Sequence, residues 1–181
     1  MTAASELSAP PAVDWPGDIH IALAAARVRQ VSYVPDAGHA RLIQLCGADP
    51  TIETVSLTTE EEGIGLACGA WLGGQRAALL MQSSGVGNCI NALAMVRTCG
   101  FPFLALVTMR GQWGEFNPWQ VPMGHATPAV LELSGFSVFP IEAPEQVGPT
   151  VAAAAKLAFD SSVPVAVLLG QRLIGTKSFA E

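Results

Sequence analysis

The chain has 181 residues, of which 50% are hydrophobic and 13% charged, and its formal net charge is −6 at pH 7. This length suits one domain with a substantial core, and the composition excludes a disordered chain. The nine Lys and Arg residues are scattered along the sequence, so it lacks the clustered positive charge that nucleic-acid binding requires. The longest apolar runs, such as residues 101–109, have about half the length that crosses a bilayer.

The ends of the chain are predicted to lie outside one central domain, residues 18–175. Residues 1–17 are rich in Pro and small polar residues, which indicates a flexible lead-in, and order is expected to begin near Asp18 as a helix N-cap. The first residues lack the charged-then-apolar pattern of a signal peptide, so we expect a cytoplasmic protein. Residues 176–181 are read as a C-terminal tail. The low charge also indicates that another chain covers much of the surface.

Short apolar runs alternate with helical segments along the domain. The strands are predicted at residues 31–35, 52–57, 77–82, 101–109, 137–141 and 164–169. The helices are predicted at residues 19–28, 39–46, from 60 onward, 88–99, 128–133 and 144–159. Because the strand runs are continuously apolar, both faces of the sheet should be covered. The sequence therefore predicts a three-layer α/β/α domain with a six-stranded, mainly parallel sheet.

The four cysteines show no CxxC pairing and lie in apolar, mostly helical contexts. They are Cys46, Cys68, Cys89 and Cys99. Buried, reduced thiols are the expected state, in preference to metal ligands or disulfides.

Three carboxylates, Glu60, Glu61 and Glu62, open the third predicted helix. Thr59 is a candidate N-cap with Glu62 at capping-box spacing, and acids in a first turn suit the helix dipole, so all three have a purely structural explanation. The helix continues with Gly and Ala, which are useful where something packs close to the backbone. A carboxylate at the mouth of such a helix is also a candidate functional group in an apolar cleft.

Other candidate loops follow the carboxyl ends of the predicted strands, where ligands bind in parallel sheets. The segment SSGVGN, residues 83–88, is either a ligand-contacting turn or a tight strand-to-helix turn capped by Ser84; it matches neither a GxGxxG fingerprint nor a Walker loop. Residues 110–125 form a long loop with two Trp, which is typical of a functional loop or of a surface that docks a partner subunit. Asp36 and His39 are either a binding pair or ordinary turn residues.

Four segments in order resemble the pyrimidine-binding domain of thiamine-diphosphate-dependent 2-oxo acid decarboxylases, a family that includes sulfopyruvate and phosphonopyruvate decarboxylases. The segments are TTEEEGIGLACGAW, LLMQSSGVGNCINAL, PFLALVTMRG and NPWQVPMGHAT. The resemblance covers roughly residues 18–175. In that family a Glu opens an E-x4-G-x-A-x-G pattern, which Glu60, Gly65, Ala67 and Gly69 match here.

The resemblance implies a role for each matching residue. Glu60 inherits the catalytic position, in which a partly buried carboxyl shares a proton with the aminopyrimidine ring of thiamine diphosphate, and the cofactor accepts the electrons released with CO2. The residues implied to lie against the pyrimidine, besides Glu60, are Ser84, Gly85, Gly87 and Asn88. The residues implied to line the substrate are Asp36, His39, Arg110, Gln120 and His125. Arg110 and the two His would suit a sulfonate or phosphonate group.

The resemblance also implies a partner chain. Single-chain relatives carry a second domain with a GDG motif that holds the Mg²⁺ ion and the diphosphate, and this sequence lacks that motif. A β subunit is expected to supply it, with the cofactor at the interface of a hetero-oligomer and the chain inactive alone. The expected reaction converts sulfopyruvate, or a similar small anionic 2-oxo acid, to the aldehyde and CO2. The alternatives are decarboxylation of phosphonopyruvate or another 2-oxo acid, and a non-catalytic α/β binding module.

Overall fold

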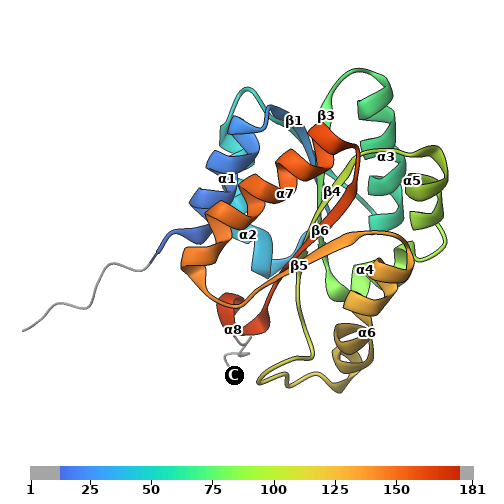
Figure 1. Ribbon diagram of the computed structural model, residues 1–181. Helices are drawn as coiled ribbons and strands as arrows, with labels where there is room; N and C mark the ends of the chain where they lie inside the picture. The colour runs from blue at the N-terminus through green and yellow to red at the C-terminus, as the bar shows by residue number, and fades with distance from the viewer. Residues whose placement is uncertain (1–12, 176–181) are drawn as a thin grey trace, which may run out of the picture.

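A computed structural model describes residues 13–175 as one six-stranded sheet between two layers of helices (Figure 1). The strands are β1 (Val28–Tyr33), β2 (Glu53–Ser56), β3 (Arg76–Gln82), β4 (Phe103–Thr108), β5 (Ser137–Ile141) and β6 (Pro164–Leu169). Every strand pairing is parallel and the strand order is β2-β1-β3-β4-β6-β5. The predicted α/β/α class is therefore confirmed, and the sheet is parallel throughout the described residues.

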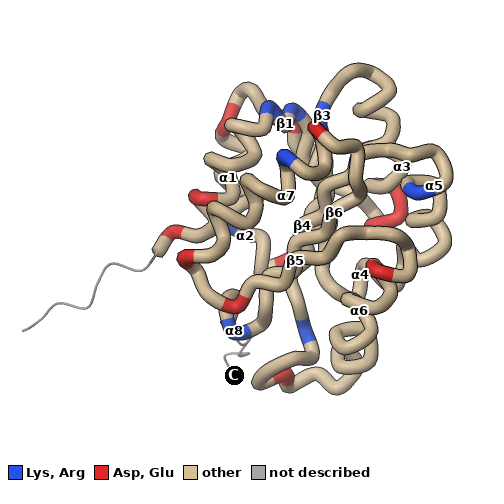
Figure 2. The backbone as a smooth tube through the Cα atoms, viewed as in Figure 1, with Lys and Arg blue, Asp and Glu red and all other residues tan. Residues whose placement is uncertain are grey.

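Two separate apolar cores fill the space between the sheet and its helix layers. One lies under α1 (Trp15–Ala25), α2 (Ala40–Ala48) and α7 (Val147–Ser161). The other lies under α3 (Glu60–Leu72), α4 (Ser83–Cys89), α5 (Leu93–Cys99) and α6 (Val121–Leu133). Figure 2 shows that the strands are almost free of charged residues, and all six residues of β4 are buried. Burial on both faces explains the continuous apolar runs in the sequence.

The strand order reverses its direction at β1. From β1 the chain crosses in one direction to β2 and then returns to the other side of β1 to form β3. In open parallel sheets, ligands bind beyond the carboxyl ends of the strands at such a reversal point. Here that point lies between the loop after β1, which contains Asp36, and the start of α4 at Ser83. Glu60 begins α3 directly after β2, on the same edge of the sheet.

The first helix begins earlier than predicted. Asp14, not Asp18, is the N-cap of α1, and its carboxylate accepts a hydrogen bond from the backbone N–H of Gly17. Pro16 occupies the first turn of this helix, where a missing N–H is harmless. Residues 13–17 are therefore not all part of a flexible segment. The remainder of the predicted lead-in, residues 1–12, and the predicted tail, residues 176–181, lie outside the described residues.

Two further helix predictions are wrong in their boundaries. The SSGVGN segment is not a turn: it forms α4 itself, because Val86 and Cys89 anchor it in the core despite its two glycines, and a break then separates it from α5. The helix predicted at residues 128–133 instead begins at Val121 and contains Pro128 in its interior. The long loop after β4 therefore ends in the short 3-10 helix η2 (Pro118–Gln120) and does not reach residue 125.

Three of the four cysteines are buried free thiols, as expected, whereas Cys99 at the end of α5 is exposed. Burial raises the pKa of Cys46 and Cys68 to about 11 and that of Cys89 to about 12. Among the helices of residues 13–175, none combines the length and apolar character needed to cross a bilayer.

Candidate active site

Glu60 differs from the two acids that follow it in the first turn of α3. Its side chain lies on the inner side of the helix and the residue is only 8% exposed, whereas Glu61 and Glu62 are exposed. Thr59 is the N-cap residue as predicted, but its side chain makes no capping hydrogen bond; Glu62 instead accepts from the N–H and the hydroxyl of Thr58, at 3.0 and 2.6 Å. These bonds hold the pKa of Glu62 below its usual value. Only Glu60 is therefore available for chemistry inside the fold.

The carboxyl group of Glu60 lies against α4. Its Oε2 accepts a hydrogen bond of 3.0 Å from the side-chain amide of Asn88. Gly85 makes this approach possible, because a methyl group at that position would overlap the carboxyl carbon and Oε1 of Glu60. Within residues 13–175, no group donates a hydrogen bond to Oε1. Three residues predicted for the site from two separate segments, Glu60 on α3 and Gly85 and Asn88 on α4, are thus brought together.

Ser84 and Gly87 also lie on α4, but their surroundings differ from those of Gly85. The hydroxyl of Ser84 donates to Oε1 of Gln82 at 2.9 Å, so it faces back toward the end of β3. Gly87 faces α6, since a methyl group there would lie 3.2 Å from Cγ and Sδ of Met123. The thioether chain of Met123 can give way, so this approach is less demanding than that of Gly85.

A polar network crosses the carboxyl ends of β1, β3 and β4. The carboxylate of Asp36 accepts from Nε2 of Gln82 at 3.0 Å and from the hydroxyl of Thr108 at 2.7 Å. Through Gln82 the network continues to Ser84 at the start of α4. Asp36 therefore ties together three loops of the predicted site, and the structure gives it a positioning function rather than a simple turn function.

His39 is completely buried at the start of α2. Its Nε2 lies 3.3 Å from the carbonyl oxygen of Met81 and 3.1 Å from that of Leu106, so this nitrogen carries the proton and donates. Its Nδ1 is buried without a partner among the described residues. Burial lowers the pKa of His39, which keeps the ring neutral near pH 7. As a neutral ring inside the fold, His39 offers no positive charge to a ligand.

Arg110 is likewise buried, and its charge is matched within the chain. Its Nε and Nη2 donate to the two carboxylate oxygens of Glu115 at 2.6 and 2.5 Å. Glu115 also accepts from the N–H groups of Gly111 and Asn117 and from Nε2 of Gln171. These donors, Arg110 first, hold the pKa of Glu115 at about 2. The pair thus fixes the loop after β4 against α8 (Gln171–Ile174).

We expect the substitution Glu115→Gln to destabilise the isolated chain by about 3 kcal/mol at pH 7, because it leaves a buried guanidinium unpaired. The folded-state pKa of Glu115 lies below its unfolded value, so its stabilising effect is complete above about pH 5 and declines as the pH falls from 4.5 toward 2. Urea unfolding followed by Trp fluorescence at pH 7 and pH 4 measures both. The control Glu132→Gln, on an exposed part of α6, should change little; an equal effect of the two substitutions would contradict this prediction.

The last two predicted substrate residues lie on the segment that follows this loop. Gln120 ends η2, is half-buried, and has a buried Oε1 without a partner among the described residues. His125 lies on α6 and is exposed. Beside them, Trp119 is 86% exposed and forms an apolar hollow with Pro118, Pro122 and Met123.

Sequence reasoning missed several residues that hold the site together. They are Gln82, Thr108, Glu115 and Gln171. Gln82 ends β3, Thr108 ends β4 and Gln171 follows β6, so all three lie at the carboxyl edge of the sheet. Because ligands bind at that edge in parallel sheets, their positions at the ends of predicted strands were a usable signal. Glu115 lies in the middle of a loop, and its position in the sequence does not indicate its partners, because these depend on the path of the loop backbone.

Taken together, the geometry gives a buried carboxyl group, held by the amide of Asn88 and packed on Gly85, near the point where the strand order of a parallel sheet reverses. A carboxyl with one oxygen fixed and the other available can hold or exchange a proton with a bound ring nitrogen. Arg110 and His39 do not present charge beside it, since the first is paired and the second neutral. The site is thus suited to proton transfer at a bound molecule.

Comparison with solved structures shows that the fold is a known one. The fold matches 2-oxoglutarate:ferredoxin oxidoreductase from Magnetococcus marinus, with a TM-score of 0.72 and 16% identity, over 88% of this chain and 29% of that one. No protein-family model matches the sequence.

Relatives in sequence identify the family. The sulfopyruvate decarboxylase α subunit of Methanococcus maripaludis is 36% identical over 152 residues, which cover 83% of this chain and 91% of the relative. That of Methanocaldococcus jannaschii is 34% identical over 83% of this chain and 89% of the relative. Phosphonopyruvate decarboxylase of Streptomyces viridochromogenes is 33% identical over 64% of this chain and 30% of its own length. The chain belongs to the family of sulfopyruvate decarboxylase α subunits.

Proposed function

We propose that this chain is the α subunit of a thiamine-diphosphate-dependent decarboxylase that converts sulfopyruvate to an aldehyde and CO2 in the cytoplasm. The observation that carries the proposal is the contact of Glu60 with Gly85 and Asn88, since two segments of the family pattern meet there around an acid. The near full-length similarity to two sulfopyruvate decarboxylase α subunits supports the choice of substrate.

The residues present fit the aminopyrimidine ring of this cofactor. Oε1 of Glu60 has no donor from the described residues and can accept a hydrogen bond from, or donate one to, a ring nitrogen. Gly85 leaves the backbone of α4 bare beside that carboxyl, where any side chain would take the place of the carboxyl or of a flat ring. When bound, the cofactor supplies a reactive carbon and an acceptor for the electrons released with CO2.

In this proposal the chain positions and moves a proton. Glu60 exchanges a proton at Oε1 with the ring nitrogen, while Asn88 fixes Oε2 and so fixes the direction in which the carboxyl points. Asp36 and Gln82 hold the loops of β1 and β3 at their separation beside α4. The exclusion of water by the partly buried position of Glu60 keeps the proton transfer between these two groups.

Of the five residues predicted to line the substrate, three are engaged within the chain. Asp36 and His39 lie at the strand ends but make their contacts within the chain, and Arg110 is neutralised by Glu115. Gln120 keeps an unsatisfied amide oxygen and His125 an exposed ring. We therefore propose Gln120 and His125 as the substrate-facing residues of this chain, and we propose that the partner subunit provides the cationic groups for the sulfonate.

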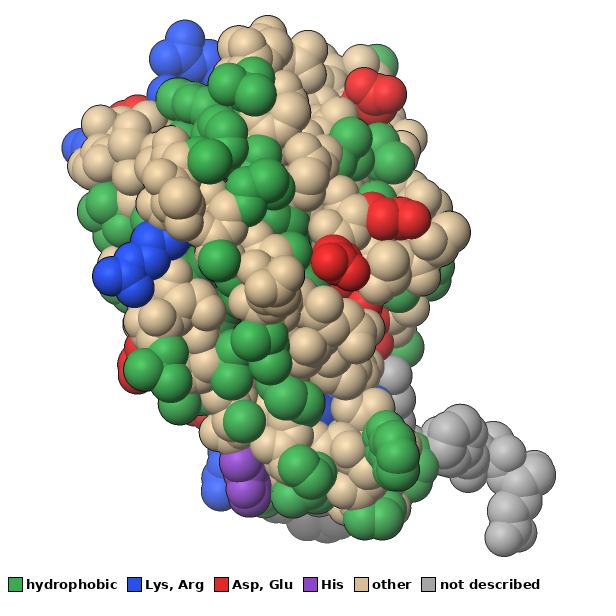
Figure 3. Space-filling view, turned by 90° about the vertical axis from the view of Figure 1, so that its right-hand side faces the viewer, with side chains coloured by type: hydrophobic (Ala, Val, Ile, Leu, Met, Phe, Trp, Pro, Cys, Tyr) green, Lys and Arg blue, Asp and Glu red, His purple; other side chains and the backbone are tan. Residues whose placement is uncertain are grey.

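We further propose that a β subunit covers the face formed by α3, α4 and α5 and holds the Mg²⁺ ion and diphosphate. Figure 3 shows this side of the molecule, where hydrophobic side chains form a broad band with few basic residues. Large apolar side chains on it, Leu72, Ile90 and Met95, are 76%, 50% and 38% exposed. Gly65 and Gly69 of α3 have open space beside them rather than a neighbour within the chain. A second chain packed on this face would also enclose Glu60.

The substitution Gly65→Ala separates stability from assembly. Gly65 lies mid-helix and exposed, so alanine should stabilise the isolated chain by roughly 0.5–1 kcal/mol. If the β subunit packs against this backbone, the added methyl should weaken association at least tenfold, or about 1.4 kcal/mol. The control is Gly47→Ala, on α2 in the opposite helix layer. It should also stabilise the isolated chain, but it should leave association with the β subunit unchanged. Urea unfolding and titration calorimetry with the β subunit measure the two effects; unchanged association of Gly65→Ala would remove this face from the interface.

The function is tested by aldehyde release from a panel of sulfopyruvate, phosphonopyruvate and pyruvate, with thiamine diphosphate and Mg²⁺ added. The co-purified α and β subunits should turn over sulfopyruvate fastest, and this chain alone should turn over none. Preference for phosphonopyruvate would favour the second substrate, which the more distant relatives support. If the complex turns over no 2-oxo acid, the alternative of a non-catalytic binding module stands.

A further inference from the structure

Basic residues gather at the end of the sheet opposite to Glu60. Arg27 follows α1, Arg29 lies in β1, Arg76 begins β3 and Lys156 lies on α7. These are four of the nine Lys and Arg residues of a chain whose net charge is −6. Figure 2 shows several basic positions near the amino-terminal ends of β1 and β3, and the four residues line two hollows that share Arg27 and Arg76. Residues far apart in the sequence thus form one positive cluster.

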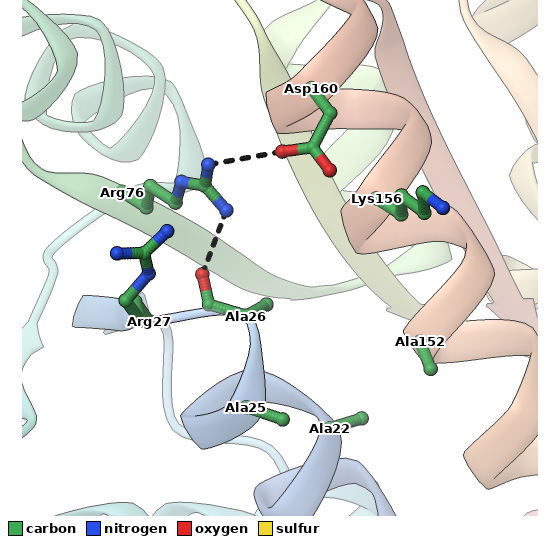
Figure 4. A pocket seen from close by; sticks show the side chains of 8 residues that line it. All are labelled: Ala22, Ala25, Ala26, Arg27, Arg76, Ala152, Lys156 and Asp160. Carbon is green, nitrogen blue, oxygen red and sulfur yellow. Dashed lines mark hydrogen bonds and ion pairs between the residues drawn. The ribbon is translucent and has the colours of Figure 1, made fainter.

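The cluster surrounds a hollow of about 300 Å³ between α1 and α7 (Figure 4). Its charged lining is Arg27, Arg76, Lys156 and Asp160, and its remaining walls are alanines: Ala22, Ala25, Ala26 and Ala152. Alanine methyl groups leave the space open and give it apolar walls. A second hollow of about 350 Å³ adjoins it and shares Arg27 and Arg76, with Arg29 added. The volume suits a small organic molecule rather than a water alone.

The cations of the hollow outnumber its acid. Arg76 is held by a 3.1 Å ion pair with Asp160, by the carbonyl oxygen of Ala26 at 3.0 Å, and over the ring of Phe159. The side chains of Arg27 and Lys156 make no hydrogen bond or ion pair with any of residues 13–175. Asp160 therefore neutralises one of three cations, which leaves two positive groups beside a fixed third.

The positive charge is not explained by the helix ends alone. A cation near the C-terminus of α1 is favourable, and Arg76 already fills that role by donating to Ala26. Arg27, in contrast, has a φ of 58°, a left-handed conformation at a helix end where glycine is the usual residue and other side chains are disfavoured. The chain thus carries an unpaired cation at a position where its backbone favours glycine.

We propose that this hollow binds a small organic anion that ends in a phosphate or sulfonate group, at a site separate from Glu60. Arg76, fixed by Asp160 and Phe159, presents a guanidinium of set orientation with Arg27 beside it, whereas the ammonium of Lys156 on α7 points away from Arg76 in Figure 4 and must turn toward the hollow to reach the oxyanion. The alanines contact the carbon skeleton of the ligand. The site lies at the amino-terminal ends of the strands, opposite to Glu60, so in this proposal it serves regulation rather than the reaction.

Titration calorimetry of the full chain with glycerol 3-phosphate, at one fixed ionic strength, tests the proposal. We expect saturable binding with one ligand per chain. Arg27→Gly and Lys156→Gln should each weaken it at least about tenfold, since each removes a charged donor. Arg27→Gly also relieves the left-handed strain, so loss of binding with retained or raised stability separates a binding defect from misfolding.

The matched control is Arg97→Gln, which removes an exposed cation from α5 in the other helix layer. It should leave the affinity unchanged. The proposal is overturned if glycerol 3-phosphate shows no saturable binding, or if Arg97→Gln weakens binding as much as the hollow variants, because the effect would then be one of net charge. It is also overturned if binding vanishes in the complex with the β subunit, since a partner chain would then fill the hollow.

Discussion

Replacing Glu60 by Gln is expected to lower the decarboxylation rate of the α–β complex by about 100-fold or more, the range for loss of a proton-transferring group. Gln keeps the size of the side chain and can still accept the hydrogen bond from Asn88 through its carbonyl oxygen. It cannot exchange a proton with a ring nitrogen. The fold should therefore persist, with unchanged far-UV circular dichroism and urea midpoint, while kcat falls.

The matched control is Glu61→Gln, one residue along the same helix turn. Glu61 has the same position relative to the helix dipole but is exposed, so its loss should alter kcat less than about twofold and stability by about 0.5 kcal/mol or less. A Glu60→Gln complex with full activity would assign the proton transfer elsewhere. Equal losses for the two variants would mean that first-turn charge alone matters.

Much of the fold follows from the sequence because strands buried on both faces leave a clear mark. The strands Ser137–Ile141 and Pro164–Leu169 match their predicted ranges. Helices were harder where local signals opposed the tertiary contacts. Pro128 was expected to begin a helix, yet α6 starts seven residues earlier, with Gly124 packed on the carbonyl oxygen of Arg110, where a methyl group would overlap it.

The site divides in the same way. The family resemblance separates Glu60 from Glu61 and Glu62, because only Glu60 matches the E-x4-G-x-A-x-G pattern, and the structure shows the same separation by burial. Arg110 was expected to line the substrate because the family resemblance implies it, and because its positive charge would suit a sulfonate or phosphonate. Its partner Glu115 was invisible in the sequence, because an ion pair within a loop depends on the path of the backbone. Residue types thus predicted the location of the site better than the partners within it.

Gly85→Ala is the second substitution expected to remove activity, although it lies outside any proton-transfer role. The added methyl would overlap the carboxyl carbon and Oε1 of Glu60. A side-chain carboxylate can move aside at little cost to the fold. Urea unfolding should therefore show a loss of about 1 kcal/mol or less in the free energy of unfolding. The moved carboxyl, however, loses Asn88 and its direction toward the ring. A displacement of the carboxyl group by about 1 Å is expected to lower kcat by about 100-fold.

Gly87→Ala is the comparison that isolates this effect. It adds the same methyl to the same helix, but its neighbours are Cγ and Sδ of Met123 at 3.2 Å, and this flexible side chain can shift by the few tenths of an ångström required. We expect it to keep activity within a few-fold and to gain helix propensity of up to about 1 kcal/mol. Steady-state kinetics of both complexes, with the affinity for thiamine diphosphate measured alongside, compare them directly. Full activity of Gly85→Ala would show that the carboxyl of Glu60 need not lie against α4, and the arrangement proposed for the active site would then be wrong.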